Sequence, residues 1–188
     1  IELAYLLSNS TLNGCVELVA YPLEEPPFFA TKKMGSYFHA EGMHESDIQV
    51  LGVIILEMIG YFTDEPNSQE YPARLFNLLY PSTGNFIAVI GKLDQRKYTK
   101  QIKSSMAGAT DLPVYSVNAP KAVPGIDFSD HRNYWEFNHQ AVMITDTAFY
   151  RNTAYHETND TWDRLDYERM SQVILGVHAA ILDQLENN

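Results

Sequence analysis

The sequence predicts a three-layer αβα domain built on a mostly parallel, mixed central sheet. Apolar runs of strand length alternate with longer amphipathic segments along the chain. Several of these runs are apolar throughout, as expected for strands that are buried on both faces. Alternating strands and helices form parallel sheets that carry helices on both sides. At 188 residues the chain has the length of one ordinary domain.

The first part of the chain alternates between helix and strand. Residues 1–9 have the pattern of a helix, and Asn13-Gly14 marks a turn before a predicted strand at 15–21. A helix is expected over residues 34–45. The continuous apolar run within residues 48–56 predicts a fully buried strand.

The middle of the chain repeats this alternation. Residues 72–80 predict a short helix that starts near its proline. Strands are expected at 86–90 and at 114–117, which prolines bound on both sides. Between these strands, residues 93–107 form a basic amphipathic pattern that is typical of an outer helix.

The last part predicts a helix at 131–138, a strand at 141–144 and a long helix at about 166–185. The long helix has one apolar face: Met170, Val173, Ile174, Val177 and Ile181. Acids at 163–166 fall where a helix dipole favours negative charge.

Composition excludes several classes of function. The net charge of −11 argues against nucleic acid or an anionic membrane as a partner, because phosphate contacts need clustered Lys and Arg. No apolar run has the length of a membrane span, so we expect a soluble domain. Cys15 is the only cysteine, which excludes an intrachain disulfide, and its strand pattern predicts a buried thiol. The cellular location stays open.

Charged side chains end two of the predicted buried strands. Glu24 and Glu25 close the apolar run at 16–23, and Glu57 directly follows the strand at 48–56. A carboxylate is costly to bury there unless it is paired, hydrogen-bonded or bound to metal. Ligand sites in such sheets lie beyond the carboxyl ends of the strands. His156, in a polar segment, offers an imidazole, and we predict that the four side chains share one site.

Four segments resemble motifs of the co-catalytic zinc aminopeptidases, a family that also contains glutaminyl cyclases and the transferrin receptor ectodomain. The run at 16–25 resembles the acid-pair motif, and residues 56–61 resemble the second ligand motif, an acid followed by an apolar residue and glycine. Residues 129–131 are similar to the Ser-Asp-His segment of the family, and residues 151–161 to its terminal ligand motif. The segments occur in family order and cover nearly the whole chain.

The resemblance implies a role for each matching residue. Glu24 would be the general base that deprotonates a metal-bound water and later protonates the leaving amine. Glu25 and His156 would bind one zinc ion, and Glu57 would bind a second. The implied activity is hydrolysis of amino-terminal peptide bonds, with peptides that carry a free amino terminus as substrates.

Other residues near these motifs have less defined roles. Asp130 and His131 are candidates for groups that hydrogen-bond the metal ligands without touching the metal, although Asp130 is equally suited to capping the helix that follows. Asp160 either orients the loop of His156 or caps the next turn. Four residues are candidates for an apolar specificity pocket, with ordinary packing as the alternative: Met58, Phe149, Tyr150 and Tyr155.

The chain also departs from the family pattern. Family members carry a His-x-Asp motif and a bridging Asp upstream of the helix that precedes the acid pair, and this chain begins inside that helix. We therefore expect a single zinc-exopeptidase-like catalytic domain over residues 1–188, truncated at its amino terminus. With too few ligands, these residues alone should bind zinc weakly or not at all and have little activity. A submicromolar two-site isotherm in calorimetric titration would contradict this expectation.

Two other functions share the predicted fold. One is an acyltransferase of the glutaminyl cyclase type, but those cyclases carry an indole directly before the metal-binding histidine, where this chain has Tyr155. The other is a non-catalytic binding domain with a dead site, as in the transferrin receptor. Retention of Glu24, Glu25, Glu57 and His156 favours hydrolysis over this alternative, because binding alone has no chemical need for all four.

Overall fold

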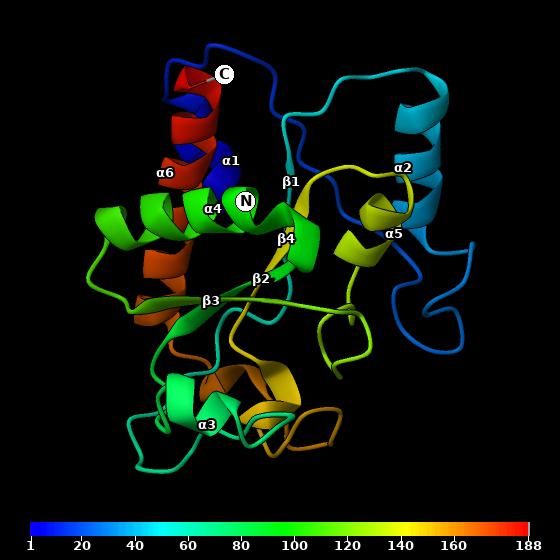
Figure 1. Cartoon of the computed structure of the whole chain (residues 1–188). Coiled ribbons are helices and arrows are strands. Elements are labelled where there is room, and N and C mark those ends of the chain that lie inside the picture. Colours follow the sequence, from blue (N-terminus) through cyan, green and yellow to red (C-terminus); the bar gives the residue numbers. More distant parts are fainter. Residues whose placement is uncertain (188) are drawn as a thin grey trace.

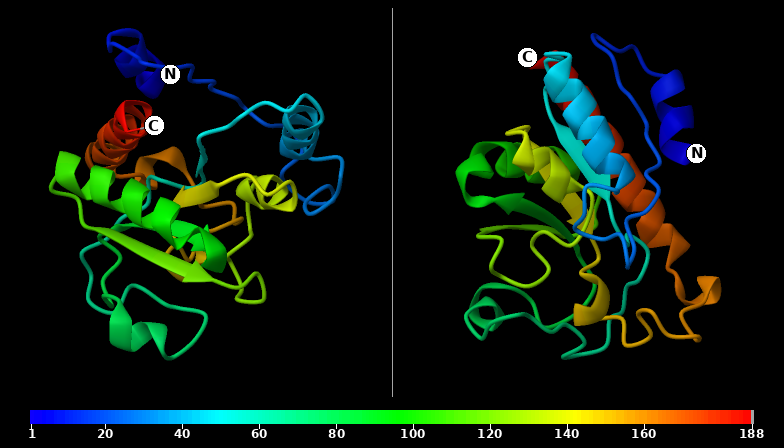
Figure 2. Two further views of the ribbon diagram at one scale, coloured as in Figure 1. Left: turned by 45° about the horizontal axis from the view of Figure 1, so that its top comes forward. Right: turned by 90° about the vertical axis from the view of Figure 1, so that its right-hand side faces the viewer.

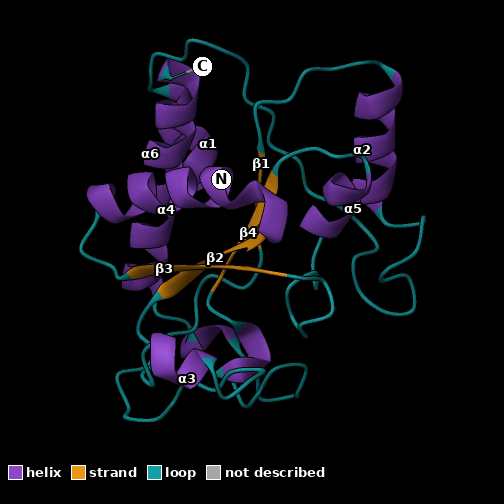
Figure 3. Cartoon of the chain, in the orientation of Figure 1, coloured by secondary structure: helices purple, strands orange, loops and turns teal. Residues whose placement is uncertain are grey.

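The computed structural model describes residues 1–187, in which four strands form a single mixed sheet (Figures 1 and 3). The strands are β1 (Val53–Leu56), β2 (Ile87–Lys92), β3 (Val114–Ala119) and β4 (Ala141–Thr145). Their order across the sheet is β1-β4-β2-β3. β1 pairs with β4 and β2 with β3 in parallel, whereas β2 and β4 are antiparallel. The predicted mostly parallel, mixed sheet is therefore confirmed.

One face of the sheet is covered by α4 (Arg96–Ala109) and α6 (Tyr167–Glu186), with α1 (Glu2–Ser8) packed on α6 (Figure 2). The apolar stripe of α6 enters a core shared with α4 and the sheet. The two helices approach closely at Gly176 of α6, where an added Cβ would lie 3.3 Å from the Met106 side chain. Asp166 caps α6 by accepting the Arg169 amide at 2.9 Å.

The opposite face carries α2 (Gly35–Glu45) and α5 (His131–Glu136), which complete the third layer (Figures 1 and 2). Their buried side chains join a second core with residues of β1, β2 and β4. Trp135 of α5 is tied to the sheet because its indole N–H donates to the Ala141 carbonyl at 2.9 Å. Helices therefore pack on both sides of the sheet, as the sequence predicts.

The predicted strand at 15–21 is absent, which corrects the sequence analysis. These residues are extended but pair with no strand in the part of the chain that the structure describes. Leu18 and Val19 are exposed instead of buried, and so is the Cys15 thiol. The apolar pattern fits a strand, but a strand also requires a neighbour to bond its backbone. β1 consequently lies at the edge of the sheet.

Two further elements are shorter than predicted. β1 begins at Val53 rather than at residue 48, because the preceding residues lead out of α2 and do not reach β4. The helix expected at 72–80 is reduced to α3 (Phe76–Leu79). Its leucines point to solvent, with Leu78 82% exposed, so α3 has no buried apolar face to extend it. Three short 3₁₀ helices complete the fold: η1 (Leu93–Gln95), η2 (Ala148–Tyr150) and η3 (Trp162–Arg164).

The mixed pairing decides which segments meet at the functional edge of the sheet. β1 and β4 end on this side, where Glu57 and Asp146 follow them. Because β2 runs antiparallel to β4, β2 and β3 begin on this side, and the loop that contains α3 lies below it in Figure 1. Within residues 1–187, no helix has the combination of length and apolar character that crossing a bilayer requires.

Candidate metal-linked active site

The acid pair, the acid that follows β1 and the predicted imidazole converge at this edge. His156 Nε2 lies 3.4 Å from Glu25 Oε1, although the two residues are far apart in the chain. Glu57 interacts electrostatically with both Glu25 and His156. Glu24 in turn interacts with Glu25 and Glu57. The structure thus places His156 and Glu25 in contact and puts Glu24 and Glu57 within electrostatic reach of them.

Glu24 has the environment of a proton acceptor that works near neutral pH. Burial is the main cause that raises the pKa of its carboxyl from 4.5 to about 7. The negative charges of Glu57, Asp130 and Glu25 raise this pKa further, and the positive charge of Arg132 lowers it. A carboxyl group in this range accepts and returns protons readily at physiological pH.

Glu57 is held by a hydrogen bond from a segment of a different layer. Ser129 Oγ donates to Glu57 Oε2 at 2.8 Å. Burial raises the pKa of Glu57, and the Ser129 hydrogen bond acts in the opposite direction by favouring the carboxylate. The serine therefore orients the carboxylate from the side of α5.

Asp130 and His131 have separate environments. Asp130 stands before α5, but its side chain does not cap the helix; it accepts a short hydrogen bond from Ser36 Oγ of α2 instead. Burial raises the pKa of Asp130, which interacts with both Glu24 and Glu57. His131 is fully buried behind this group, and its Nε2–H donates to the Ile126 carbonyl at 2.8 Å. Burial lowers the pKa of His131 to about 4, so the ring is neutral at physiological pH. Its contacts are those of a side chain that packs in the interior.

The loop of His156 is fixed by its own side chains. Asn152 Nδ2 donates to Asp160 Oδ1 at 3.0 Å, which supports the orienting role considered for Asp160. His156 itself has left-handed backbone geometry, with φ of 61°. The Tyr155 ring stacks on the imidazole at a centroid distance of 4.0 Å and an interplanar angle of 16°. These contacts restrict the directions in which the imidazole can point.

An apolar pocket opens beside Glu57. Its empty space is about 850 Å³ with the open mouth included, and Glu57 lies on its wall. The four residues that the sequence analysis considers for a specificity pocket all line it: Met58, Phe149, Tyr150 and Tyr155. The remaining walls include aromatic residues that the sequence analysis does not identify: Tyr71, Phe76, Tyr80, Phe86, Tyr115 and Phe128.

Three tyrosines of this pocket direct their hydroxyl groups toward the protein backbone. Tyr71 donates to the Pro81 carbonyl at 2.6 Å, Tyr80 to the Ser116 carbonyl at 2.8 Å and Tyr150 to the Pro124 carbonyl at 3.2 Å. Because their polar ends are satisfied there, the rings present mainly carbon to the pocket. The arrangement suits an apolar or aromatic side chain that enters next to Glu57.

The donor set at the acid cluster fits part of a zinc site. Zinc ligands in a tetrahedral arrangement lie about 3.3 Å apart when each is about 2.0 Å from the ion. The His156–Glu25 separation of 3.4 Å agrees with this, and both atom types are zinc donors. Among residues 1–187, however, no group of three or more His, Cys, Asp and Glu side chains is close enough to hold a metal ion. The described residues therefore place at most two such donors together here.

The shifted pKa of Glu24 has a measurable effect on the stability of the metal-free chain. Between the unfolded value of 4.5 and the folded value of about 7, the folded chain binds more protons at Glu24 than the unfolded chain does. The contribution of Glu24 to the free energy of unfolding therefore becomes more favourable to the folded state as the pH falls through about 7. We expect Glu24→Gln to raise the thermal unfolding midpoint at pH 8 and to reduce the midpoint gain between pH 8 and pH 5.5.

Glu157→Gln is a suitable control for this measurement, since Glu157 is an exposed acid in the same region. It should leave the pH dependence of the midpoint unchanged. If the curves for Glu24→Gln and the original chain stay parallel between pH 5.5 and 8, the raised pKa of Glu24 is wrong.

Sequence relatives show where this chain belongs. The profile of Peptidase family M28 matches residues 1–181. Over 177 residues, or 94% of its length, the chain is 49% identical to YfbL, an uncharacterised protein of Escherichia coli K12. This match covers 54% of YfbL, so the chain spans about half the length of that relative.

Solved structures with the same fold include two bacterial aminopeptidases. The LapA aminopeptidase of Legionella pneumophila superimposes with a TM-score of 0.56 and 19% identity, covering 80% of this chain and 36% of LapA. BSAP, a zinc aminopeptidase from Bacillus subtilis, gives a TM-score of 0.50 and 17% identity, covering 78% of this chain and 31% of BSAP. At these identities the likeness establishes the fold alone.

Proposed function

The chain belongs to Peptidase family M28, and from this premise we propose that the full-length protein is a zinc-dependent aminopeptidase. It would hydrolyse the first peptide bond of substrates that carry a free amino terminus, and residues 1–188 would form part of its catalytic domain. The observation that carries the proposal is the convergence of Glu24, Glu25, Glu57 and His156 beside an apolar pocket.

Glu25 and His156 would hold one zinc ion and Glu57 a second, with the other ligands supplied outside this set. When bound, zinc lowers the pKa of a coordinated water to near neutrality and polarises a carbonyl group. The 3.4 Å separation of His156 and Glu25 and the electrostatic proximity of Glu57 support this division. Ser129 would keep the Glu57 carboxylate in the orientation that its ligand role needs.

Glu24 would act as the general base. Its carboxylate would take a proton from the attacking water and return it to the departing amine, so that the same group serves both half-reactions. A pKa of about 7 allows both transfers near neutral pH, because the group binds and releases a proton with similar ease. The electrostatic interaction of Glu24 with Glu57 and Glu25 supports this role.

The pocket would receive the side chain of the amino-terminal residue. Its carbon-rich walls exclude water from this side chain, and Glu57 on the wall links the pocket to the reacting bond. Bulky apolar and aromatic residues would therefore be preferred over charged ones.

Activity on two substrates tests the proposal. We expect the purified full-length protein to release p-nitroaniline from Leu-p-nitroanilide, to lose this activity with a chelator and to regain it with zinc. A peptide that begins with glutamine should be hydrolysed rather than cyclised. Cyclisation of that peptide without hydrolysis of the Leu substrate would indicate a glutaminyl cyclase. Absence of both reactions in zinc-loaded protein would indicate a binding domain.

A further inference from the structure

Asp146 is a buried carboxylate that joins two chain segments at the site. It directly follows β4, and its side chain accepts three backbone amides. Oδ2 accepts from Gly60 at 3.1 Å and Tyr61 at 2.7 Å, and Oδ1 accepts from Ala148 at 3.0 Å. The Asp146 amide also donates to the Met58 carbonyl at 2.7 Å. Asp146 thus binds the segment after Glu57 on one side and the segment that leads to His156 on the other.

The backbone at these two segments is in an unfavourable conformation. Met58, Thr147 and Ala148 have φ values of 48°, 78° and 49°, in the left-handed region that residues other than glycine rarely adopt. Such conformations persist only where surrounding contacts enforce them. The hydrogen bonds of Asp146 reach Met58 and Ala148 directly. Asp146 is therefore placed to enforce the left-handed backbone conformation in both segments.

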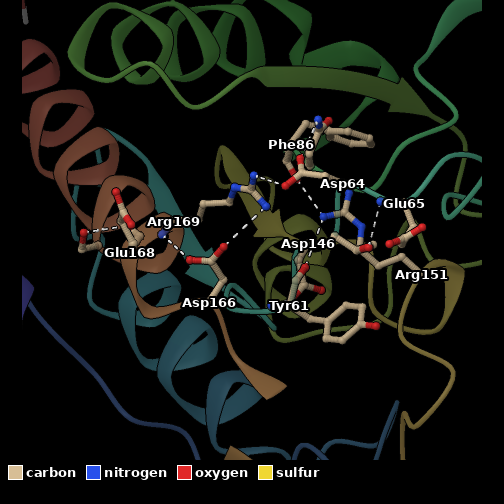
Figure 4. Close-up of polar contacts among 12 residues, drawn as sticks. Tyr61, Asp64, Glu65, Phe86, Asp146, Arg151, Asp166, Glu168 and Arg169 are labelled. Carbon is tan, nitrogen blue, oxygen red and sulfur yellow. Dashed lines mark hydrogen bonds and ion pairs between the residues drawn. The ribbon is translucent and has the colours of Figure 1, made fainter. Parts of the chain in front are cut away.

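Arg151 supports the same two segments from the side of β2 (Figure 4). Its NH1 group donates to the Phe86 carbonyl at 2.9 Å and to the Tyr61 carbonyl at 3.4 Å. Its Nε donates to Gln69 Oε1 at 2.8 Å, and Gln69 Nε2 donates to Thr147 Oγ1 at 2.9 Å. The close-up shows Tyr61 beside both Asp146 and Arg151. The segments that carry Glu57 and His156 are consequently connected through one buried network.

We propose that Asp146 is a positioning residue whose carboxylate sets the placement of the Glu57 segment relative to the His156 loop. This inference rests on the proposed function, in which Glu57 and His156 hold metal. Asp146 itself would touch neither metal nor substrate, since its oxygens are occupied by backbone amides. A metal site depends on such outer contacts because they fix where the ligand atoms lie before the ion binds.

The number of acceptors makes Asp146→Asn an informative change. The carboxylate accepts with both oxygens, one for each segment, whereas an amide has a single acceptor oxygen and a nitrogen that donates. The substitution preserves the size of the side chain but must lose the hydrogen bonds of one oxygen, either those from Gly60 and Tyr61 or the one from Ala148. Asp146→Asn should therefore loosen the connection without opening a cavity.

The experiment uses the full-length protein at pH 8. Hydrogen–deuterium exchange of metal-free protein should show faster exchange at residues 57–62 or 147–157 in Asp146→Asn than in the original protein. Zinc affinity, measured by competition with a chelating dye, should fall by about 10- to 100-fold. The visible spectrum of the cobalt-substituted variant should change, because the ligand geometry around the ion is altered.

Thr99→Val is the matched control for a buried polar substitution. Thr99 of α4 is fully buried, accepts from Asn118 Nδ2 at 2.8 Å and lies in the layer of α4 and α6. The Thr99→Val variant should have a lower unfolding midpoint. At temperatures where the protein is folded, its zinc affinity and its cobalt spectrum should be unchanged. The inference is overturned if Asp146→Asn leaves exchange at both segments unchanged. Where the original protein binds zinc tightly, it is also overturned if the zinc affinity of Asp146→Asn equals that of Thr99→Val.

Failure of the proposed function gives a different result. In that case the original full-length protein would neither bind zinc tightly nor cleave Leu-p-nitroanilide. The exchange measurement on metal-free protein would still decide whether Asp146 positions the two segments. Faster exchange would support the positioning role, and unchanged exchange would refute it.

Discussion

Glu24→Gln in the full-length protein is expected to lower kcat by about 10²- to 10⁴-fold, the usual contribution of a general base. The amide is close in size to the carboxylate but cannot accept a proton from water at neutral pH. Because Glu24 is proposed to move protons and not to bind zinc, the metal content should remain at the original level. Steady-state kinetics on Leu-p-nitroanilide together with metal analysis would measure both quantities.

The environment of Glu24 explains why we expect a large fall in kcat. Burial and three neighbouring acids raise its pKa to about 7, so the group is far more basic than an ordinary glutamate. Its replacement therefore removes a proton acceptor that no nearby exposed acid can replace. Glu157→Gln serves as the control, because it changes an exposed glutamate next to His156 and should retain most of the activity. If Glu24→Gln retains kcat within a few-fold of the original, Glu24 is not the base.

Phe86→Ala is expected to reduce the free energy of unfolding of the 188-residue chain by about 3–5 kcal/mol. Phe86 is 2% exposed, and its ring contacts Tyr115 in a T-shaped arrangement at a centroid distance of 5.1 Å. The Arg151 guanidinium lies 4.5 Å from the centroid of the same ring. Truncation removes apolar contacts and leaves a buried cation without the ring that it packs against. Urea unfolding at pH 7 would measure the loss.

Phe38→Ala is the control, because it makes the same truncation of phenylalanine to alanine at an exposed position. Phe38 lies on α2 and is 64% exposed, so the same truncation should change the free energy of unfolding by no more than about 0.5 kcal/mol. Equal losses in the two variants would show that Phe86 is not part of the packed interior. A loss of the expected size would also connect the wall of the pocket to the stability of the whole chain, because domains are stable by only about 5–15 kcal/mol.

The sequence predicts the helix and sheet layers correctly, and the four site residues stay a prediction whose geometry the structure supports only for the contact of His156 with Glu25. Hydrophobic periodicity identifies the long helices, because α4 and α6 each bury one continuous face. The rule that ligand sites lie at the ends of strands applies to Glu57, which follows β1. The same rule places the acid pair, but the strand on which that placement rests is absent from residues 1–187. Glu57 is identifiable because its charge follows an apolar strand directly. His156 is identifiable because it is an imidazole in a polar loop.

What the sequence does not predict depends on contacts between distant segments. The apolar pattern at 15–21 predicts a strand, but pattern alone does not provide the neighbour that a strand must bond. Asp146 follows a buried strand just as Glu57 does, so the same rule applied to β4 would have identified it. Two of its three amide partners, Gly60 and Tyr61, come from a distant segment and have no signal in its own neighbourhood, whereas Ala148 lies two residues further along the chain.

The position of β1 has a practical consequence for work with the isolated chain. One side of β1 carries amide and carbonyl groups that no other strand within residues 1–187 engages, and Leu56 is exposed on it. An open edge of this kind is a template on which a second molecule can add a strand. Concentrated samples should therefore associate edge to edge and aggregate, and a lysine introduced along β1 would be the first remedy to try.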